Sequence, residues 1–374
     1  MTAIQDPAWT KRNSGANVGL TADGTAVHIY VLRDDGIEVA IMNYGARIVS
    51  IRTPDRYGNL ADVVLNYSGL DSYVADVSSY LGAVVGRYAN RIAGGRFSID
   101  GHIVQTTVNN GANMLHGGSD GFDRRVWAAH SFSSRVELTL KSEDGDQGFP
   151  GNLTVRVRYT VMPRALRIDY FFTTDRTTVV NLTNHAYFNL SGRPEASILG
   201  DELAIAADYY TPIDSRLIPV GTLLPVDDTP FDFRSRTVIG SRIESDDRQL
   251  ELAGGYDHNF VLTGEAGELR KVAHLHNPDS GRTLTVSTTE PGVQFYTGNF
   301  LDGTSYGAAQ ERHGRRTGLC LETQHFPDSP NHPNFPSTEL QPGRMGLSTT
   351  IFEFSVDTPW NHDVAQSPGA PLHE

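Results

Sequence analysis

The chain has a single cysteine, Cys320, among its 374 residues. One thiol excludes an intramolecular disulfide and also a zinc site built from several cysteines. No apolar run approaches the ~18 residues of a transmembrane helix, and residues 1–13 lack the apolar stretch of a signal peptide. We therefore expect a soluble, cytoplasmic protein with no contact to a membrane.

Basic residues are scarce relative to acidic ones. The chain holds 31 Lys and Arg against 44 Asp and Glu, which gives a formal net charge of −13. A nucleic-acid partner is unfavourable, because such proteins present a basic surface to the phosphates. The basic residues also form no obvious cluster along the chain, which disfavours a phosphorylated substrate.

Common catalytic signatures are missing as well. The sequence has no Gly-rich phosphate loop, no dinucleotide fingerprint, no Gly-x-Ser-x-Gly elbow and no His-Glu-x-x-His. Long helical periodicity is also hard to find, and only residues 67–75 and 235–242 are predicted as short helices. Without an alternation of strands and long helices, a Rossmann fold or a TIM barrel is a poor interpretation.

Alternation of apolar and polar residues is the dominant pattern. Leu153, Val155, Val157 and Tyr159 alternate with polar residues, and similar stretches occur at 37–41, 136–140, 166–172 and 284–286. This period of two predicts half-buried strands. Asp100-Gly101 predicts a hairpin turn between strands at 97–99 and 102–104. We expect an all-β fold, a sandwich or a barrel, in a single domain across residues 1–374, with a surface tail at 365–374.

Six segments are dense in polar side chains beside aromatic ones, which strands rarely tolerate. They are 86–92, 115–123, 181–190, 255–260, 292–299 and 321–331. Each hydroxyl of a polyol both donates and accepts hydrogen bonds, so carboxylate, amide and guanidinium groups can bind it. Aromatic faces can cover the apolar side of a sugar ring. The composition of these segments therefore suits a sugar ligand.

The same regions resemble the aldose 1-epimerase family, the galactose mutarotases. The matching stretches, in the family's order, are 86–92, 115–127, 144–151, 181–192, 210–221, 255–260, 289–303 and 320–343. The resemblance implies a large antiparallel β-sandwich with an open cleft across one face. It also implies an isomerase that interconverts the α and β anomers of free aldohexoses such as glucose and galactose, by general acid/base ring opening and closure. No cofactor and no metal are needed for this reaction.

The resemblance also assigns roles to individual residues. Glu322 matches the general base that takes the proton of the C1 hydroxyl, and His185 matches the general acid that donates to the ring oxygen. His116 matches a second histidine that binds substrate and steadies charge on the ring side. The residues implied to bind sugar hydroxyls are Asn90, Arg91, Asp257 and Gln294. Phe295 and Tyr187 are expected neighbours of the sugar ring.

Cys320 lies two residues before Glu322, so strand alternation puts both on one face. Because the reaction needs no covalent step, we expect Cys320 to be buried by packing. His274 and His276 have the spacing of metal ligands on a strand, but no third ligand is evident and no metal site is expected there.

Two further groups of polar residues are expected to lie outside the site. Asp144 and Asp146 suggest a calcium loop, yet they match a structural loop of the family. His313, His325 and His332 lie in polar segments and are expected to be solvated.

Two alternatives stay open. The chain could be a sugar-binding or regulatory protein without catalysis. It could also epimerise or isomerise another cyclic hemiacetal, such as a disaccharide, a sugar phosphate or a pathway intermediate, with the same acid and base. We expect a small-molecule monosaccharide as its partner, and a monomer or a homodimer.

Overall fold

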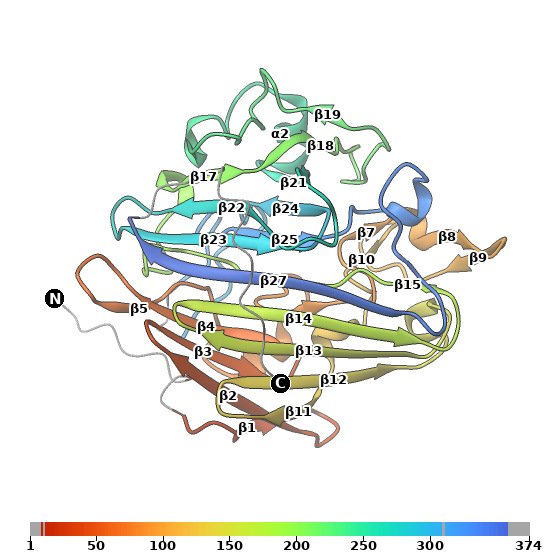
Figure 1. The fold of residues 1–374 in the computed structure, drawn as a ribbon, viewed down its shortest axis with the longest axis horizontal. Coiled ribbons are helices and arrows are strands. Elements are labelled where there is room, and N and C mark those ends of the chain that lie inside the picture. The colour runs from red at the N-terminus through yellow and green to blue at the C-terminus, as the bar shows by residue number, and fades with distance from the viewer. Residues whose placement is uncertain (1–8, 10–11, 309–310, 358–374) are drawn as a thin grey trace.

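Strands dominate the computed structural model, which describes Trp9, residues 12–308 and residues 311–357. These residues contain 27 strands and two short α-helices (Figure 1). The all-β prediction is confirmed. The predicted tail at 365–374 lies outside the described residues.

Three sheets hold most of the strands. The first has the order β1 (Ala16–Leu20), β2 (Ala26–Asp34), β3 (Ile37–Met42), β4 (Arg47–Pro54) and β5 (Leu60–Asp62). The largest has the order β11 (Ala128–Ser131), β12 (Arg135–Ser142), β13 (Leu153–Met162), β14 (Ala165–Thr174), β27 (Met345–Val356), β23 (Arg282–Thr288), β22 (Arg270–His276), β17 (Glu202–Ile205) and β20 (Thr237–Val238). The third has the order β19 (Leu224–Pro225), β18 (Ala207–Tyr210), β21 (Asp257–Leu262), β24 (Gly292–Tyr296) and β25 (Cys320–Gln324).

Smaller elements connect these sheets. The two-stranded pairs are β6 (Val84–Val85) with β16 (Thr183–Asn184), β7 (Arg91–Ile92) with β10 (Met114–Leu115), β8 (Arg96–Ile99) with β9 (His102–Gln105), and β15 (Thr178–Val179) with β26 (Glu339–Leu340). The 3-10 helices are η1 (Ala93–Gly95), η2 (Phe122–Arg124), η3 (Asp146–Gly148), η4 (Ile198–Gly200), η5 (Ile239–Ser241) and η6 (Ser329–Asn331).

The main apolar core lies where the large sheet meets the two five-stranded sheets. On β13 the side chains of Val155, Val157 and Tyr159 are buried, while the intervening residues are exposed or half-buried. The same buried cluster includes Ile41 of the first sheet and Phe260 of the third. The period-two pattern of residues 153–162 thus decides which face of β13 is buried.

The hairpin predicted at residues 97–104 is present as β8 and β9. Its two turn residues, Asp100 and Gly101, both have positive φ, at 49° and 74°. This is the geometry of a two-residue type I′ turn, which Asp-Gly favours.

The two helix predictions have different outcomes. Helix α1 (Leu70–Ala75) forms within 67–75, as predicted. The helix predicted at 235–242 is wrong, because β20 and η5 occupy that region. Helix α2 (Arg248–Ala253) was missed, although Asp247 caps its first amides and Gly254 ends it in a left-handed conformation. Neither α-helix of the described residues has the length and apolar character to cross a membrane.

Candidate active site

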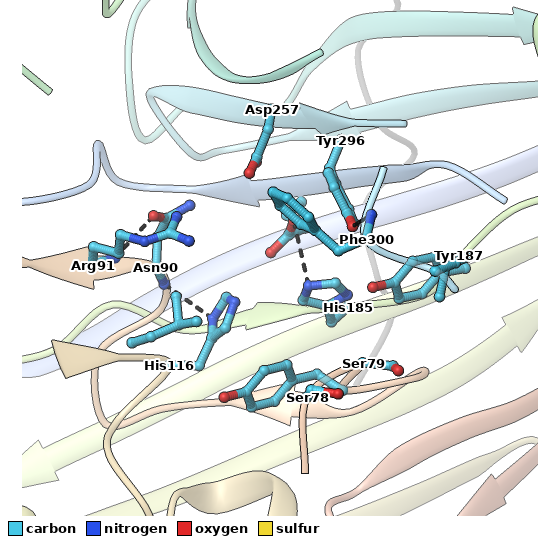
Figure 2. Close-up of a pocket in the computed structure, with 14 residues that line it drawn as sticks. Ser78, Ser79, Asn90, Arg91, His116, His185, Tyr187, Asp257, Tyr296 and Phe300 are labelled. Atoms are coloured by element: carbon cyan, nitrogen blue, oxygen red, sulfur yellow. Dashed lines mark hydrogen bonds and ion pairs between the residues drawn. The ribbon is translucent and has the colours of Figure 1, made fainter. Parts of the chain in front are cut away.

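A cavity of about 160 Å³ opens beside the third sheet (Figure 2). Six of the seven residues predicted for the site line it, and they come from five separate stretches of the chain. They are Asn90, Arg91, His116, His185, Asp257 and Glu322. The seventh, Gln294, does not line the cavity. Its Nε2 instead donates a hydrogen bond to Asp257 Oδ1 at 2.7 Å.

Glu322 sits in the middle of β25, a strand in which every residue is buried. Its pairing partner on β24 is Gln294. Alternation sends Leu321 into the apolar core, while Glu322 lines the cavity. Burial and the nearby Asp257 carboxylate raise the pKa of Glu322 well above its ordinary value, although the Arg91 charge opposes them. These surroundings therefore favour the protonated form of the carboxyl.

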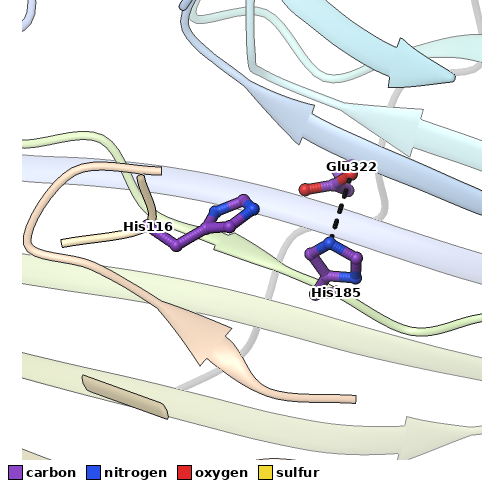
Figure 3. Close-up of side chains that lie close together, drawn as sticks. All are labelled: His116, His185 and Glu322. Atoms are coloured by element: carbon purple, nitrogen blue, oxygen red, sulfur yellow. Dashed lines mark ion pairs between the residues drawn. The ribbon is translucent and has the colours of Figure 1, made fainter. Parts of the chain in front are cut away.

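His185 directly follows β16 and is held by its backbone. Its N–H donates to Ala83 O at 2.8 Å, and its carbonyl accepts from the Gly82 N–H at 2.9 Å. Its Nε2 lies 3.7 Å from Glu322 Oε1 (Figure 3). Burial lowers the pKa of His185 to about 4, so the imidazole is neutral near pH 7. The two groups predicted to move protons are therefore neighbours.

His116 is placed by a tight turn that its sequence neighbours make possible. It has a positive φ of 50°, and Gly117 follows with φ 91°. A Cβ on Gly117 would lie 1.8 Å from Gly86 O, so only glycine fits there. The Asn90 N–H donates to His116 Nδ1 at 3.1 Å. A neutral His116 therefore carries its proton on Nε2 and acts as a hydrogen-bond donor.

The segment that carries Asn90 and Arg91 is anchored by a buried arginine. Arg87 is 2% exposed. Its guanidinium donates to the carbonyls of Ser142, Glu143, Pro150 and Gly151. Nε of Arg91 in turn donates to Asn110 Oδ1 at 3.1 Å. The Arg91 charge lowers the pKa of both Asp257 and Glu322, against the effect of their burial.

The aromatic neighbours differ from those predicted. Tyr187 lines the cavity, as expected. The prediction for Phe295 is wrong, because its ring is buried in the core and stacks on Tyr256 at 5.2 Å. The next residue, Tyr296, lines the cavity instead and stacks on Phe300. Alternation along β24 from Gln294 could have revealed this, since residues two apart share a face.

Cys320 is buried in an apolar cluster, as predicted. Its Sγ also lies 3.5 Å from His185 Nδ1, a contact that the sequence did not indicate.

The three histidines expected in solvent have different surroundings. His313 is 1% exposed. His325 and His332 are half-buried, and they form ion pairs with the buried carboxylates of Glu290 and Asp328. Polar sequence surroundings did not distinguish a solvated histidine from one with a buried partner.

Three cavity side chains could also hold a metal ion. One ligating atom each of His116, His185 and Glu322 lie within 4.8 Å of one another (Figure 3). Two imidazoles and a carboxylate suit zinc. The carboxylates of the acidic loop near η3 are instead engaged in hydrogen bonds within the protein. Asp146 accepts hydrogen bonds from Ser142 and Arg125, and Asp144 accepts one from the Gly151 N–H.

The arrangement suits proton transfer to and from a polyhydroxylated ligand. It offers one carboxyl and one imidazole in contact, with amide, guanidinium and carboxylate groups around them. The site is matched to general acid/base catalysis.

Known proteins share this chain's sequence and fold. The aldose 1-epimerase family profile matches residues 28–353. The galactose mutarotase of Rattus norvegicus is 44% identical over 337 residues, which cover 90% of this chain and 96% of that protein. The aldose 1-epimerase of Escherichia coli K12 is 40% identical over 343 residues, which cover 90% and 98%. The crystal structure of galactose 1-epimerase from Lactobacillus acidophilus has a TM-score of 0.79 at 30% identity, covering 91% of this chain and 98% of that one. The chain belongs to the aldose 1-epimerase family.

Proposed function

We propose that this protein is an aldose 1-epimerase, a mutarotase that interconverts the α and β anomers of free aldohexoses such as glucose and galactose. The observation that carries this proposal is the contact of His185 Nε2 with Glu322 Oε1 at 3.7 Å, within a cavity lined by hydroxyl-binding groups. Family membership and the similarity to galactose mutarotases support the same activity.

Ring opening moves two protons. Glu322 takes the proton of the C1 hydroxyl while His185 gives one to the ring oxygen, and the bond between C1 and that oxygen breaks. The resulting aldehyde turns about the C1–C2 bond. In closure His185 takes the proton back from the C5 hydroxyl, Glu322 returns its proton to the carbonyl oxygen, and the ring forms with the other anomeric configuration.

The remaining residues bind and orient the sugar. Asp257 and Arg91 pair with hydroxyls, and Gln294 holds Asp257 in place through its 2.7 Å hydrogen bond. Asn90 keeps His116 oriented through its backbone N–H. His116 donates from Nε2 to the oxygen that gains charge. Because the bound sugar is already held in the reactive orientation, the reaction in the site loses less entropy than the same reaction in solution.

Polarimetry on freshly dissolved α-D-glucose and α-D-galactose tests the proposal. The protein is expected to speed the decay to the same equilibrium rotation, and Glu322→Gln is expected to remove the acceleration while the fold is retained. A wild-type rate in Glu322→Gln would contradict the assigned base. Tight monosaccharide binding without acceleration by the wild-type protein would instead indicate a binding or regulatory role.

A second substrate class, the reducing disaccharides, is favoured by one observation. A cavity of about 530 Å³ adjoins the first, and Ser78, Tyr80 and Leu115 line both. Tyr80, whose ring lies 4.6 Å from that of His116, lines both cavities. With the reducing unit in the smaller cavity, a second sugar unit would enter the larger one.

A bulky side chain in the larger cavity distinguishes the two substrate classes. The exposed Ser119 lines only that cavity. Ser119→Trp is expected to raise KM for a reducing disaccharide such as maltose and to leave KM for glucose unchanged. Equal effects on both sugars, or no effect on either, would speak against the larger cavity as a subsite.

We further propose that the chain forms one domain, because a single buried cluster has members from Leu32 to Phe354. A cytoplasmic location and a monomer or homodimer belong to the same proposal. The one cysteine is buried and free, so the fold needs no oxidising compartment. Light scattering on the purified protein determines the oligomeric state.

A further inference from the structure

Two segments that carry the proposed catalytic and binding groups are not paired with each other. Asn90 directly precedes β7 and Arg91 begins it, and β7 pairs with β10, whereas Glu322 lies on β25, which pairs with β24. The separation between Arg91 and Glu322 therefore depends on contacts outside the strand pairings.

Asn181 joins these two segments directly. Its Nδ2 donates to Ala89 O and to His325 O, each at 3.2 Å, and its Oδ1 accepts from the His325 N–H at 3.0 Å. Its backbone carbonyl also accepts from the Ala89 N–H at 2.7 Å. The side chain is 2% exposed, so no water competes for these bonds. One buried amide thus ties the residue before Asn90 to the residue after β25.

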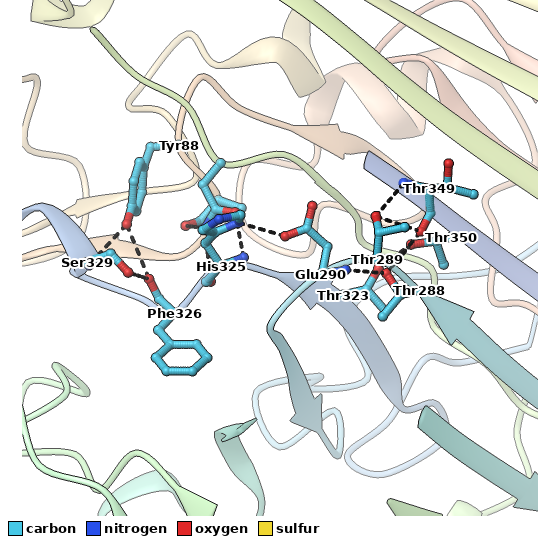
Figure 4. A network of polar contacts seen from close by, with 12 residues as sticks. Tyr88, Thr288, Thr289, Glu290, Thr323, His325, Phe326, Ser329, Thr349 and Thr350 are labelled. Atoms are coloured by element: carbon cyan, nitrogen blue, oxygen red, sulfur yellow. Dashed lines mark hydrogen bonds and ion pairs between the residues drawn. The ribbon is translucent and has the colours of Figure 1, made fainter. Parts of the chain in front are cut away.

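More hydrogen bonds link the same two segments. The Asp328 N–H donates to Arg91 O at 2.8 Å, and Asp328 Oδ1 accepts from the Ala93 N–H at 2.9 Å. The Tyr88 hydroxyl donates to Phe326 O at 3.2 Å (Figure 4). Residues 325–329 are therefore the surface against which residues 87–93 are aligned.

An ion pair holds the beginning of that surface. His325 Nδ1 lies 2.7 Å from Glu290 Oε2, and the Glu290 side chain is 7% exposed (Figure 4). Burial alone would raise the pKa of Glu290, but the charge and hydrogen bond of His325 and a hydrogen bond from Ser348 outweigh it, and the pKa lies below its ordinary value. The pKa of His325 is raised by Glu290 against the opposing effect of burial. Arg270 donates to the backbone carbonyl of Glu290 at 3.0 Å, and its charge also favours the ionised carboxylate.

Glu290 is itself fixed to the sheets. It lies in the turn between β23 and β24, and its N–H donates to Thr288 Oγ1 at 3.1 Å. Thr288 Oγ1 contacts Thr350 Oγ1 of β27 at 3.1 Å, which contacts Thr323 Oγ1 at 2.6 Å (Figure 4). Thr323 is the residue next to Glu322. The ion pair and these threonine contacts therefore hold the end of β25, just after the proposed base, to the large sheet.

We propose that Glu290 and His325 are positioning residues, whose ion pair sets the distance between Glu322 and the Asn90–Arg91 segment through Asn181. Neither residue lines the cavity. The inference rests on the proposed function, because it assigns the pair a role in the proton transfer by Glu322. A misplacement of about 1 Å can cost a reaction about 10²-fold in rate.

The test uses a matched pair elsewhere in the fold. His276 Nδ1 lies 2.8 Å from Glu202 Oε2, between β22 and β17 of the large sheet. Arg236 also contacts Glu202 at 3.1 Å and Asp357 contacts His276 at 3.6 Å, so the control has the same His–carboxylate contact within a larger ion-pair group. The variants are His325→Ala and Glu290→Gln, with His276→Ala and Glu202→Gln as controls. The measurements are Tm, and kcat and KM for anomer exchange.

The expected result is a split between kcat and KM. His325→Ala loses kcat by about 10- to 100-fold, with KM little changed because Arg91 and Asp257 still bind hydroxyls. The control variants keep kcat even where Tm falls equally. His325→Asn, whose amide nitrogen can take the place of Nδ1, restores most of the rate. Equal kcat in the His325 and His276 variants would overturn the proposal.

A readout that does not depend on catalysis separates this inference from the proposed function. Amide hydrogen exchange in peptides covering 87–93 and 325–329 is expected to speed up in His325→Ala and to stay unchanged in His276→Ala. If the wild-type protein does not accelerate anomer exchange, the proposed function fails. Unchanged amide hydrogen exchange in these peptides would overturn the claim that the ion pair holds the two segments together, whereas faster hydrogen exchange would support that structural claim whether or not the protein is a mutarotase.

Discussion

His185 Nε2 lies 3.7 Å from Glu322 Oε1, and burial shifts the pKa values of the two groups in opposite directions. Burial raises the pKa of Glu322 and lowers that of His185 to about 4. Burial thus favours the neutral form of both groups. Ring opening needs one acid and one base, so a single proton shared by the pair serves both roles, and Glu322 is the ionised partner when it acts first as the base.

The first prediction concerns the pH dependence of kcat/KM, which reports the pKa values of the free enzyme. Below about pH 4 both groups are protonated and no base remains, because the pKa of His185 is about 4. Above the raised pKa of Glu322 neither group holds the proton and no acid remains. A bell-shaped profile is expected from anomer-exchange rates measured between pH 3.5 and 9. A flat profile across that range would contradict the pairing.

Substitutions of the two cavity histidines, His185 and His116, are expected to reduce activity by different amounts because the two side chains have different roles. His185→Asn removes a proton-transfer group and should lower kcat by ~10²–10⁴-fold with little change in KM. His116→Asn removes a neutral hydrogen-bond donor. We expect it to reduce transition-state stabilisation by about 1–3 kcal/mol, which lowers kcat/KM roughly 5- to 150-fold. Steady-state kinetics on α-D-galactose measures both. A larger effect at His116 than at His185 would reverse the assignment of the acid.

Substitutions of the two neighbouring aromatic residues of β24, Phe295 and Tyr296, are expected to affect protein stability and sugar binding separately. Phe295→Ala empties a packed core position and is expected to cost about 3–5 kcal/mol of unfolding free energy, with KM unchanged for the folded protein. Tyr296→Leu removes the aromatic ring that lines the cavity and should raise KM more than it lowers Tm. Thermal unfolding and kinetics on the same samples give both quantities. A raised KM in Phe295→Ala alone would restore Phe295 as a sugar neighbour.

Metal binding and catalysis are expected to exclude each other at this site. Zn²⁺ held by His116, His185 and Glu322 would occupy the groups that move protons. Added zinc should inhibit, His116→Ala should weaken that inhibition, and prolonged dialysis against a chelator should leave the activity intact. Activity that is lost on chelation and recovered with zinc would instead show a metal-dependent reaction.

Local sequence determines much of this protein. The period-two pattern decides which residues of β13 are buried, because successive side chains of a strand point to opposite faces. Asp100-Gly101 determines the β8–β9 turn, since that turn needs two positive φ angles. The resemblance to the family predicted six of the residues that line the cavity, because each of them lies within a short stretch of sequence typical of the family.

Only the tertiary structure decided how those stretches meet. Gln294 was predicted to bind sugar, but its contact is Asp257, which the pairing of β21 with β24 sets. His325 was expected in solvent, and its buried partner Glu290 lies 35 residues away. The opposite pKa shifts of Glu322 and His185 likewise need the enclosure that segments distant in the chain provide. Burial and contact between distant residues are properties of packing, and no local pattern encodes them.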